Sequence, residues 1–195
     1  IGGSSAASGT LQSATMAKND LDGKIYIFDT QNLSIGSSCF ALSAAEMIEN
    51  GESIDNIINH LEEIKKGINI FFTVDTLDYL QKGGRLSLAK ATIGNMLNIK
   101  PILSVEDGMV KPVGQVRGKK QVLNKIINTI KENIGNDLSK KRVMLTYGDN
   151  ELELISFKER IEEEFDVSNI IVENVSSSIC SYTGPGIIGI VCADI

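Results

Sequence analysis

The sequence KIYIFD at residues 24–29 and the sequence INIFFTV at residues 68–74 decide the expected fold. Near-continuous apolar character over the first stretch is typical of a strand that is covered on both faces, as in a parallel sheet. Two helices are expected between the stretches, at about 37–49 and 53–66, and the second carries isoleucine and leucine on one helical face. Strand, helices and strand in this order favour βαβ units and an α/β fold.

The chain after Gly67 has a different pattern. Asp107 and Gly108 stand between the apolar runs 99–105 and 109–116, and Asp-Gly in this setting is a hairpin signal. The hairpin predicts a second, mixed sheet, so we expect a boundary near Gly67, between a first domain containing residues 1–67 and a second of residues 68–195. Further elements are expected at 10–19, 77–97 (helical, broken at Gly83-Gly84), 121–134, 142–147, 169–175 and 187–193, with a helix opened by an Asn150–Glu153 capping box.

Composition narrows the function classes. The chain has 195 residues, with 19 Lys and Arg against 25 Asp and Glu, so its net charge is −6. This acidity argues against nonspecific nucleic-acid binding, which needs clustered Lys and Arg. The three cysteines, Cys39, Cys180 and Cys192, lie far apart, so we expect no disulfide framework and a reducing, cytoplasmic location. No run of 18 apolar residues is present, so we expect no transmembrane segment.

The usual catalytic and metal-binding motifs are missing from the sequence. No Cys/His cluster has metal-ligand spacing, and the single histidine is His60 on an acidic helix. The patterns GxxxxGK[ST], GxSxG and HExxH are absent. We therefore expect no catalytic residues, no metal and no cofactor, and a protein that is not an enzyme.

A hydroxyl-rich turn, Ser8-Gly9-Thr10, stands at the start of an expected helix. A helix N-terminus offers unpaired N–H groups and a partial positive charge that suit a carboxylate or phosphate, and the hydroxyls add donors. The same residues are also typical of an ordinary N-cap. Both interpretations stay open on the sequence alone.

Gly83-Gly84-Arg85 is a second candidate. Two glycines permit close approach of the backbone to a ligand, and Arg85 supplies a permanently charged, fork-shaped donor for a carboxylate. The alternative is a helix C-cap followed by a surface arginine. Thr183-Gly184-Pro185-Gly186 is either a tight turn or, if it faces Ser8 and Arg85, a part of the same site.

A short basic island, Arg117-Gly118-Lys119-Lys120, stands out in this acidic chain. Arg117, Lys119 and Lys120 are candidates for docking an acidic partner surface or a phosphate. The alternative is a solvated helix start.

Several of these features occur together in a known order. SGTLQSA at 8–14, IFDTQNLSIG at 27–36, VDTLDYLQKGGRLS at 74–87 and GNMLNIKPIL at 94–103 are followed by DG, by VRGKKQ and by TGPG at 183–186. This series resembles the DegV family of bacterial fatty-acid-binding proteins over essentially the whole chain. Family members have a further N-terminal part of the first domain, which is absent from these residues.

The resemblance implies a two-domain α/β protein, with a Rossmann-like, mostly parallel sheet in the first domain and a mixed sheet in the second. It implies a long-chain fatty acid with its carboxylate between the domains and its tail in an apolar tunnel. Some members, called FakB, present the acid to a fatty acid kinase, FakA, which makes acyl-phosphate for phospholipid synthesis. Such a carrier has no catalytic machinery of its own.

The resemblance also assigns roles to residues. Ser8 corresponds to the hydroxyl that bonds the carboxylate, and Arg85 belongs to the network around the head group. Many members have a histidine immediately before TGPG, where this chain has Tyr182, which donates a hydrogen bond but does not ionise near neutral pH. The expected ligand-binding residues are Ser8, Thr10, Arg85, Tyr182 and Thr183. Residues that could line the tunnel, or belong to the core instead, include Phe71, Phe72, Met96, Leu97 and Ile99.

Two rival functions remain. The first is an enzyme, a phosphotransferase related to the fold of dihydroxyacetone kinases, which is an analogy of fold only. The second is a regulatory or interaction module, in which the basic island would matter more than Ser8 and Arg85.

Overall fold

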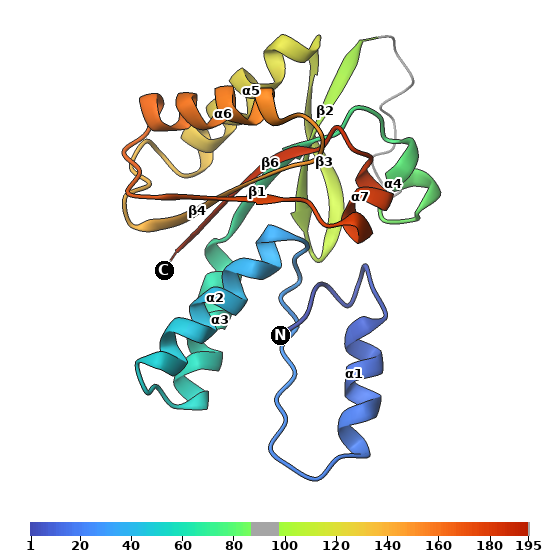
Figure 1. The fold of residues 1–195 in the computed structure, drawn as a ribbon, viewed down its shortest axis with the longest axis vertical. Helices are drawn as coiled ribbons and strands as arrows, with labels where there is room; N and C mark the ends of the chain where they lie inside the picture. Colours follow the sequence, from blue (N-terminus) through green and yellow to red (C-terminus); the bar gives the residue numbers. More distant parts are fainter. Residues whose placement is uncertain (87–97, 195) are drawn as a thin grey trace.

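The computed structural model describes residues 1–86 and 98–194. In this part of the chain six strands form one sheet in the order β3-β2-β1-β6-β4-β5 (Figure 1). The β4–β5 pair is parallel and the other pairs are antiparallel, so the mixed α/β fold expected from the sequence is confirmed. The strands are β1 (Asn69–Thr73), β2 (Ile99–Glu106), β3 (Met109–Arg117), β4 (Lys141–Tyr147), β5 (Ile170–Asn174) and β6 (Ile188–Asp194).

Helices cover both faces of this sheet (Figure 1). On one face lie α5 (Val122–Asn133) and α6 (Glu151–Glu164), whose apolar stripes close one buried cluster. On the other face lie α2 (Ile35–Glu49), α3 (Ile54–Gly67) and α7 (Ser177–Thr183), which close a second cluster. The remaining helices are α1 (Thr10–Asn19) and α4 (Asp78–Lys82), with a 3-10 turn, η2 (Lys119–Gln121).

Strand alternation assigns neighbouring side chains to opposite faces. Phe71 of β1 packs in the cluster under α5 and α6, whereas Phe72 packs in the cluster under α2 and α3. Both rings are buried. The face that carries Phe72 is the one that holds the candidate site.

The predicted hairpin is confirmed. Asp107 and Gly108 have φ of 51° and 76°, the positive values that a two-residue type I′ turn requires. The tip of this hairpin lies against the N-terminal segment, because a Cβ added to Gly108 would lie 2.1 Å from Oγ of Ser4. Glycine at this position therefore permits both the turn and the contact.

The prediction of a strand at residues 24–29 is wrong. This segment is extended, but its pairing is limited to a single parallel bridge between Gly2 and Asp29, with Gly2 N donating to Phe28 O at 3.0 Å. Within the described residues the segment has no neighbouring strand on either side, so its apolar character does not produce a ladder. Tyr26 is half exposed in consequence.

Three other expectations need correction or lie out of reach. Asn150 is the N-cap of α6 but makes no side-chain capping bond, and its Oδ1 instead accepts from Gly148 N at 3.3 Å. The sequence missed α7, between β5 and β6. Of the helical stretch at 77–97, α4 ends at Gly83 as expected, and residues 87–97 lie outside the described residues. The division into residues 1–67 and 68–195 stays a prediction.

Candidate functional site

A cavity of about 280 Å³ lies on the face of the sheet that carries Phe72. Its floor comes from β1, β4 and β6, and includes Ile70, Phe72, Thr146 and Gly189. Its walls come from the N-terminal loop, the start of α2, α4, the β2–β3 hairpin and α7. Segments from the two ends of the chain therefore face each other across one cavity.

All five residues expected to bind a ligand lie in the wall of this cavity. We call this set the polar cluster: Ser8, Thr10, Arg85, Tyr182 and Thr183. Sheet register explains why residues so far apart in sequence meet. Thr73, at the end of β1, is paired with Ile188, at the start of β6, so α4 and α7 lie beside the same edge of the cavity.

Ser8 and Thr10 form the hydroxyl part of the polar cluster. Their side-chain oxygens are 2.9 Å apart, and Ser8 Oγ also accepts from the backbone N–H of Thr10 at 3.3 Å. The N-cap of α1 is Gly9, which has no side chain to cap the helix. The N-cap interpretation therefore accounts for the bond from Thr10 N to Ser8 Oγ, but not for the contact between the two hydroxyls. Both residues line the cavity, so the hydroxyls and the start of α1 lie at its wall.

Arg85 provides the positive charge of the polar cluster. Its Nε donates to the carbonyl of Ala7 at 3.0 Å, and its Nη1 donates to the carbonyl of Gly83. Within residues 1–86 and 98–194, no carboxylate lies close enough to Arg85 to form an ion pair. A guanidinium has five N–H groups, so these two bonds fix its plane and leave donors for a ligand.

Tyr182 packs against Arg85 and against the glycine before it. The Cζ atom of Arg85 lies 4.6 Å from the centroid of the Tyr182 ring, within the range of a cation–π contact. A Cβ added to Gly83 would lie 2.4 Å from Cδ1 of the same ring. Gly83 is therefore needed less for a backbone turn than to leave room for Tyr182.

The end of α7 packs against α4 in the same way, through Gly184 and Tyr79. Gly184 has φ of 76°, and a Cβ there would lie 2.8 Å from Cε2 of Tyr79 in α4. The hydroxyl of buried Thr183 lies 3.2 Å from the carbonyl of Ile179 and 3.1 Å from that of Gly184. Of the segment 183–186, Thr183, the last residue of α7, lines the cavity together with Ser8 and Arg85, whereas residues 184–186 follow the helix and are not part of the lining.

Sequence reasoning missed several polar residues of the cavity. Ser34 precedes α2, Ser178 lies in α7 and Thr146 lies in β4. Thr146 is buried, and its Oγ1 has no hydrogen-bond partner within the described part of the chain. Its alternation with buried Met144 and Arg142 along β4 was the available signal, but it does not distinguish a cavity floor from core.

The apolar residues proposed for the tunnel divide between two places. Phe72 lines the cavity, whereas Phe71 belongs to the core on the opposite face of the sheet, and Ile99 is not among the lining residues. Met96 and Leu97 lie outside the described residues. Apolar lining that the sequence did not single out includes Leu33, Ile35, Val105, Val110, Ile179 and Ile187.

The basic island lies outside the cavity wall. Arg117 ends β3, and Lys119 and Lys120 lie in η2. Lys119 Nζ is 2.9 Å from Glu153 Oε2, and this hydrogen bond raises the pKa of Lys119. Arg117 and Lys120 are exposed, so these two are the freer charges of the island.

Three other features of the described residues bear on a metal site, a membrane-spanning helix and the reactivity of the thiols. Among residues 1–86 and 98–194, no three His, Cys, Asp or Glu side chains are grouped as a metal site would require. In the same ranges no helix is both long and apolar enough to span a membrane. Burial raises the pKa of Cys39 to about 11 and that of Cys192 to about 12, so these thiols are poor nucleophiles.

The cavity therefore joins two kinds of surface. One part carries a cation, several hydroxyls and the start of α1, and the rest of the floor and wall is largely apolar. Such a site can hold a molecule that has an anionic or polar head and an apolar body. The fold and the cavity together define an α/β protein with a cavity that is partly polar and largely apolar.

The chain belongs to the DegV family, because the family model described as "Uncharacterised protein, DegV family" matches residues 1–194. It is 38% identical over 170 residues to a DegV domain-containing protein of Clostridium acetobutylicum, covering 86% of this chain and 60% of that protein. It is 33% identical over 188 residues to a protein of Thermotoga maritima named fatty acid-binding protein, covering 95% of this chain and 65% of the relative.

The fold agrees with that of solved family members. A DegV family protein from Thermus thermophilus, described by its fatty acid binding, matches with a TM-score of 0.91 at 30% identity. The match covers 99% of this chain and 69% of that chain. This chain spans between 60% and 67% of the length of the curated relatives it matches.

Proposed function

We propose that this protein binds a long-chain fatty acid, with the carboxylate at the polar cluster and the acyl chain along the apolar floor of the cavity. One observation carries the proposal: Arg85, Ser8 and Tyr182, which come from three distant segments, meet at one part of a cavity that is otherwise largely apolar. Membership of a family in which relatives are named fatty acid-binding proteins supports the same ligand class.

The carboxylate needs compensation when it leaves water. Burial of an unpaired charge is costly, and charge-assisted hydrogen bonds offset this cost. Arg85 supplies the opposite charge, and its orientation is already fixed by the carbonyls of Ala7 and Gly83. The hydroxyls of Ser8 and Thr10 add neutral donors beside it. Because these groups are held before binding, little side-chain ordering is required when the ligand arrives.

The acyl chain gains from apolar burial. Ile70 and Phe72 of β1 and Ile187 just before β6 supply apolar surface, and Gly189 has no side chain to fill the space. Each methylene that leaves water contributes about 0.8 kcal/mol. Affinity is therefore expected to rise with chain length until the cavity is full.

The identity of the bound ligand can be tested without choosing a ligand in advance. We expect denaturing extraction of the purified protein, followed by mass spectrometry, to recover a fatty acid in near-stoichiometric amount. Arg85→Ala should lower the recovered amount strongly, whereas Arg117→Ala, outside the cavity, should not. Recovery of no lipid from protein that also fails to bind added oleic acid would contradict the proposal.

We also propose a carrier role, in which the bound acid is presented to a fatty acid kinase that forms acyl-phosphate. The absence of familiar catalytic motifs from the sequence favours binding over catalysis. Exposed Arg117 and Lys120 are the proposed docking charges, while Lys119 is engaged by Glu153. We expect Arg117→Glu with Lys120→Glu to reduce acyl-phosphate formation by the kinase and to leave oleate affinity unchanged. An unchanged rate would contradict this docking surface.

The rival phosphotransferase makes a different prediction. An enzyme of that kind should turn over a nucleotide in the absence of any kinase, whereas the proposed carrier should not. Phosphate release from ATP by the purified protein, abolished by a substitution in the cavity, would favour the rival.

A further inference from the structure

The loop at residues 4–8 carries two contacts of the polar cluster, and its ends are fixed by buried Ser4, whose N–H donates to Asn32 O at 2.8 Å, and by buried Ala7. Ser8 lines the cavity, and the Ala7 carbonyl accepts from Arg85 Nε at 3.0 Å. Ser5 and Ala6 are exposed, so burial alone does not fix the middle of the loop. Its internal bonds, from Ala7 N and Ser8 N to Ser4 O at 3.2 and 3.0 Å, close a local turn and do not place that turn on the protein.

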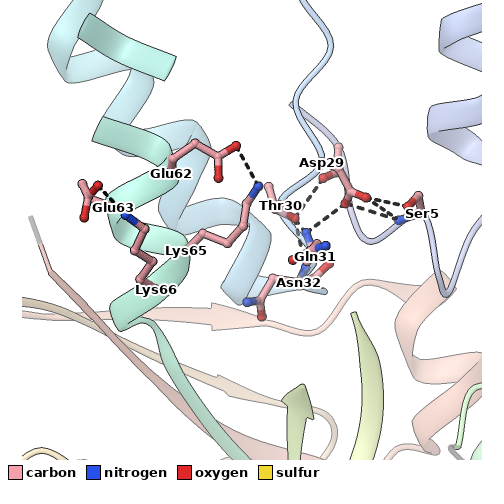
Figure 2. Close-up of polar contacts among 10 residues, drawn as sticks. Ser5, Asp29, Thr30, Gln31, Asn32, Glu62, Glu63, Lys65 and Lys66 are labelled. Carbon is pink, nitrogen blue, oxygen red and sulfur yellow. Dashed lines mark hydrogen bonds and ion pairs between the residues drawn. The ribbon is translucent and has the colours of Figure 1, made fainter. Parts of the chain in front are cut away.

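One carboxylate attaches the middle of this loop to the rest of the chain (Figure 2). Ser5 Oγ donates to Asp29 Oδ2 at 2.5 Å, and Ser5 N donates to both carboxylate oxygens, at 3.3 and 3.4 Å. The two residues are 24 positions apart in sequence. A charged acceptor makes each of these bonds stronger than a neutral one would.

Asp29 is itself held in a fixed orientation. Its Oδ1 also accepts from Gln31 N at 2.9 Å, which closes an Asx-type turn over residues 29–31 that ends at Gln31, a residue with φ of 49°. The next residue, Thr30, donates through Oγ1 to Gly2 O at 2.9 Å. The carboxylate therefore rests on a backbone turn and on the N-terminal segment, and does not swing freely.

The contacts form a continuous path to the cation of the site. Asp29 holds Ser5, Ser5 precedes the Ala6-Ala7 peptide, and Ala7 O fixes the plane of Arg85. Ser8, next in the loop, places its hydroxyl in the same cavity wall. Asp29 does not line the cavity within the described residues, so it acts on a ligand only through this loop.

We propose that Asp29 is a positioning residue for the polar cluster, which holds the loop at 4–8 so that Ser8 and Ala7 present the correct geometry to Arg85 and to the head group of the ligand. This inference rests on the proposed fatty-acid binding. It gives Asp29 an indirect part in the recognition of the carboxylate head, through the loop at 4–8, and no part in accommodating the acyl chain.

The chain offers a matched control. Asp137 Oδ1 accepts from Ser139 Oγ at 2.6 Å and from Ser139 N at 2.9 Å, the same chemistry between residues two positions apart. Asp137 lies outside the cavity wall and forms an isolated parallel bridge with Asp166 through its backbone. Asp137→Ala thus removes an aspartate–serine contact of equal kind without touching the loop at 4–8.

The first measurement needs no lipid. In delipidated protein we expect the Nε–H resonance of Arg85 to shift or broaden in Asp29→Ala and in Ser5→Ala, and to coincide with wild type in Asp137→Ala. Ser5→Ala keeps the Asp29–Gln31 turn, so it remains informative if Asp29→Ala folds poorly. An Arg85 resonance that is identical in all four proteins would overturn the inference.

The second measurement compares head groups. Affinities for oleic acid and for oleyl alcohol, measured by displacement of cis-parinaric acid, separate carboxylate recognition from burial of the chain. We expect Asp29→Ala to lower the affinity for oleic acid about tenfold and the affinity for oleyl alcohol by less than about twofold. Asp137→Ala should change neither.

The outcomes distinguish this inference from the proposed function. If wild type binds oleic acid and Asp29→Ala binds it equally well, the positioning role is wrong and fatty-acid binding stands. Equal weakening of acid and alcohol would mean that Asp29 supports the cavity as a whole, which also overturns the role. If wild type binds neither probe, the proposed function fails, and the head-group role of Asp29 fails with it.

Discussion

The guanidinium of Arg85 lies over the ring of Tyr182, with 4.6 Å between Cζ and the ring centroid. The same ring fills the space left by the missing side chain of Gly83. The GGR and TGPG segments, almost one hundred residues apart, therefore meet as one packed unit. This unit orients a cation toward a largely apolar cavity, and the predictions below start from it.

Substitution of Arg85 is expected to have the largest effect on ligand affinity. Arg85→Ala removes the charge that offsets carboxylate burial, so we expect oleate affinity to fall by about ten- to a hundredfold. Arg85→Lys should recover only part of this loss, because an ammonium cannot replace a planar fork. Isothermal titration with oleate checks both variants.

Arg117→Ala is the matched control for Arg85, because it also removes an arginine charge but lies at the end of β3, outside the cavity wall. We expect its oleate affinity to stay within about twofold of wild type. If Arg117→Ala weakened binding as much as Arg85→Ala, general electrostatic attraction would explain the data better than a specific site.

Gly83→Ala tests the packing of Tyr182. The added methyl would lie 2.4 Å from Cδ1 of Tyr182, so the ring must move away and Arg85 must lose its stacking partner. We expect a loss of about 1–3 kcal/mol in the free energy of unfolding, together with weaker oleate binding. Gly114→Ala is the control, because its nearest contact would be an ordinary 3.6 Å to Lys125 Cε. Equal behaviour of the two variants in urea unfolding and titration would contradict the packing account.

Phe71 and Phe72 offer a test of which face binds the chain. Both are buried neighbours in β1, but only Phe72 lines the cavity. Each change to leucine should cost about 1 kcal/mol or somewhat more in the free energy of unfolding. Only Phe72→Leu should alter the order of affinities for myristic, palmitic and stearic acids. If Phe71→Leu changed the order of affinities and Phe72→Leu did not, the acyl chain would lie on the face of the sheet opposite the cavity, which would contradict the proposal.

Asp29 should give the stability a specific dependence on pH. Burial raises the pKa of its carboxyl, but the hydrogen bonds from Ser5 and Gln31 and the charge of Lys65 outweigh burial and lower the pKa overall. A lowered folded-state pKa stabilises the protein above the unfolded value, near 3.9, and this contribution is lost as the pH falls through the folded value. The difference in urea midpoint between wild type and Asp29→Asn should therefore be constant from pH 5 to 7 and shrink below about pH 4. A difference that does not change with pH would show that ionised Asp29 has no such role.

Much of the fold was predictable because strong periodicity determines local structure. The apolar stripes that gave α3, α5 and α6, and the Asp107-Gly108 turn, are local signals. The prediction of a strand at 24–29 failed because an apolar run indicates that a stretch prefers burial but does not indicate which strand pairs with it. The short helix α7 was missed because its serine-rich start resembles a loop, although Ser176 Oγ caps it by accepting from Ile179 N.

The site was predictable only as a set of separate candidates. Ser8, Arg85 and Thr183 each had an ordinary structural alternative, and nothing in their spacing brings them together. The resemblance to a family united them. The register of β1 against β6 brings Arg85 and Thr183 together, and the bond from Arg85 Nε to Ala7 O brings the segment of Ser8 beside them. Thr146 and Asp29 were out of reach because one depends on which face of β4 meets a cavity and the other on a contact across 24 residues.

A structure of the protein with oleic acid tests the central claim most directly. The account predicts an elongated ligand in the cavity, with a carboxylate oxygen at roughly 2.7–3.2 Å from a guanidinium nitrogen of Arg85 and at hydrogen-bond distance from Ser8 Oγ. The acyl chain should cross the floor formed by Phe72 and Gly189. An oleate bound with its carboxylate away from Arg85, or a cavity that stays empty at saturating oleate, would contradict the account.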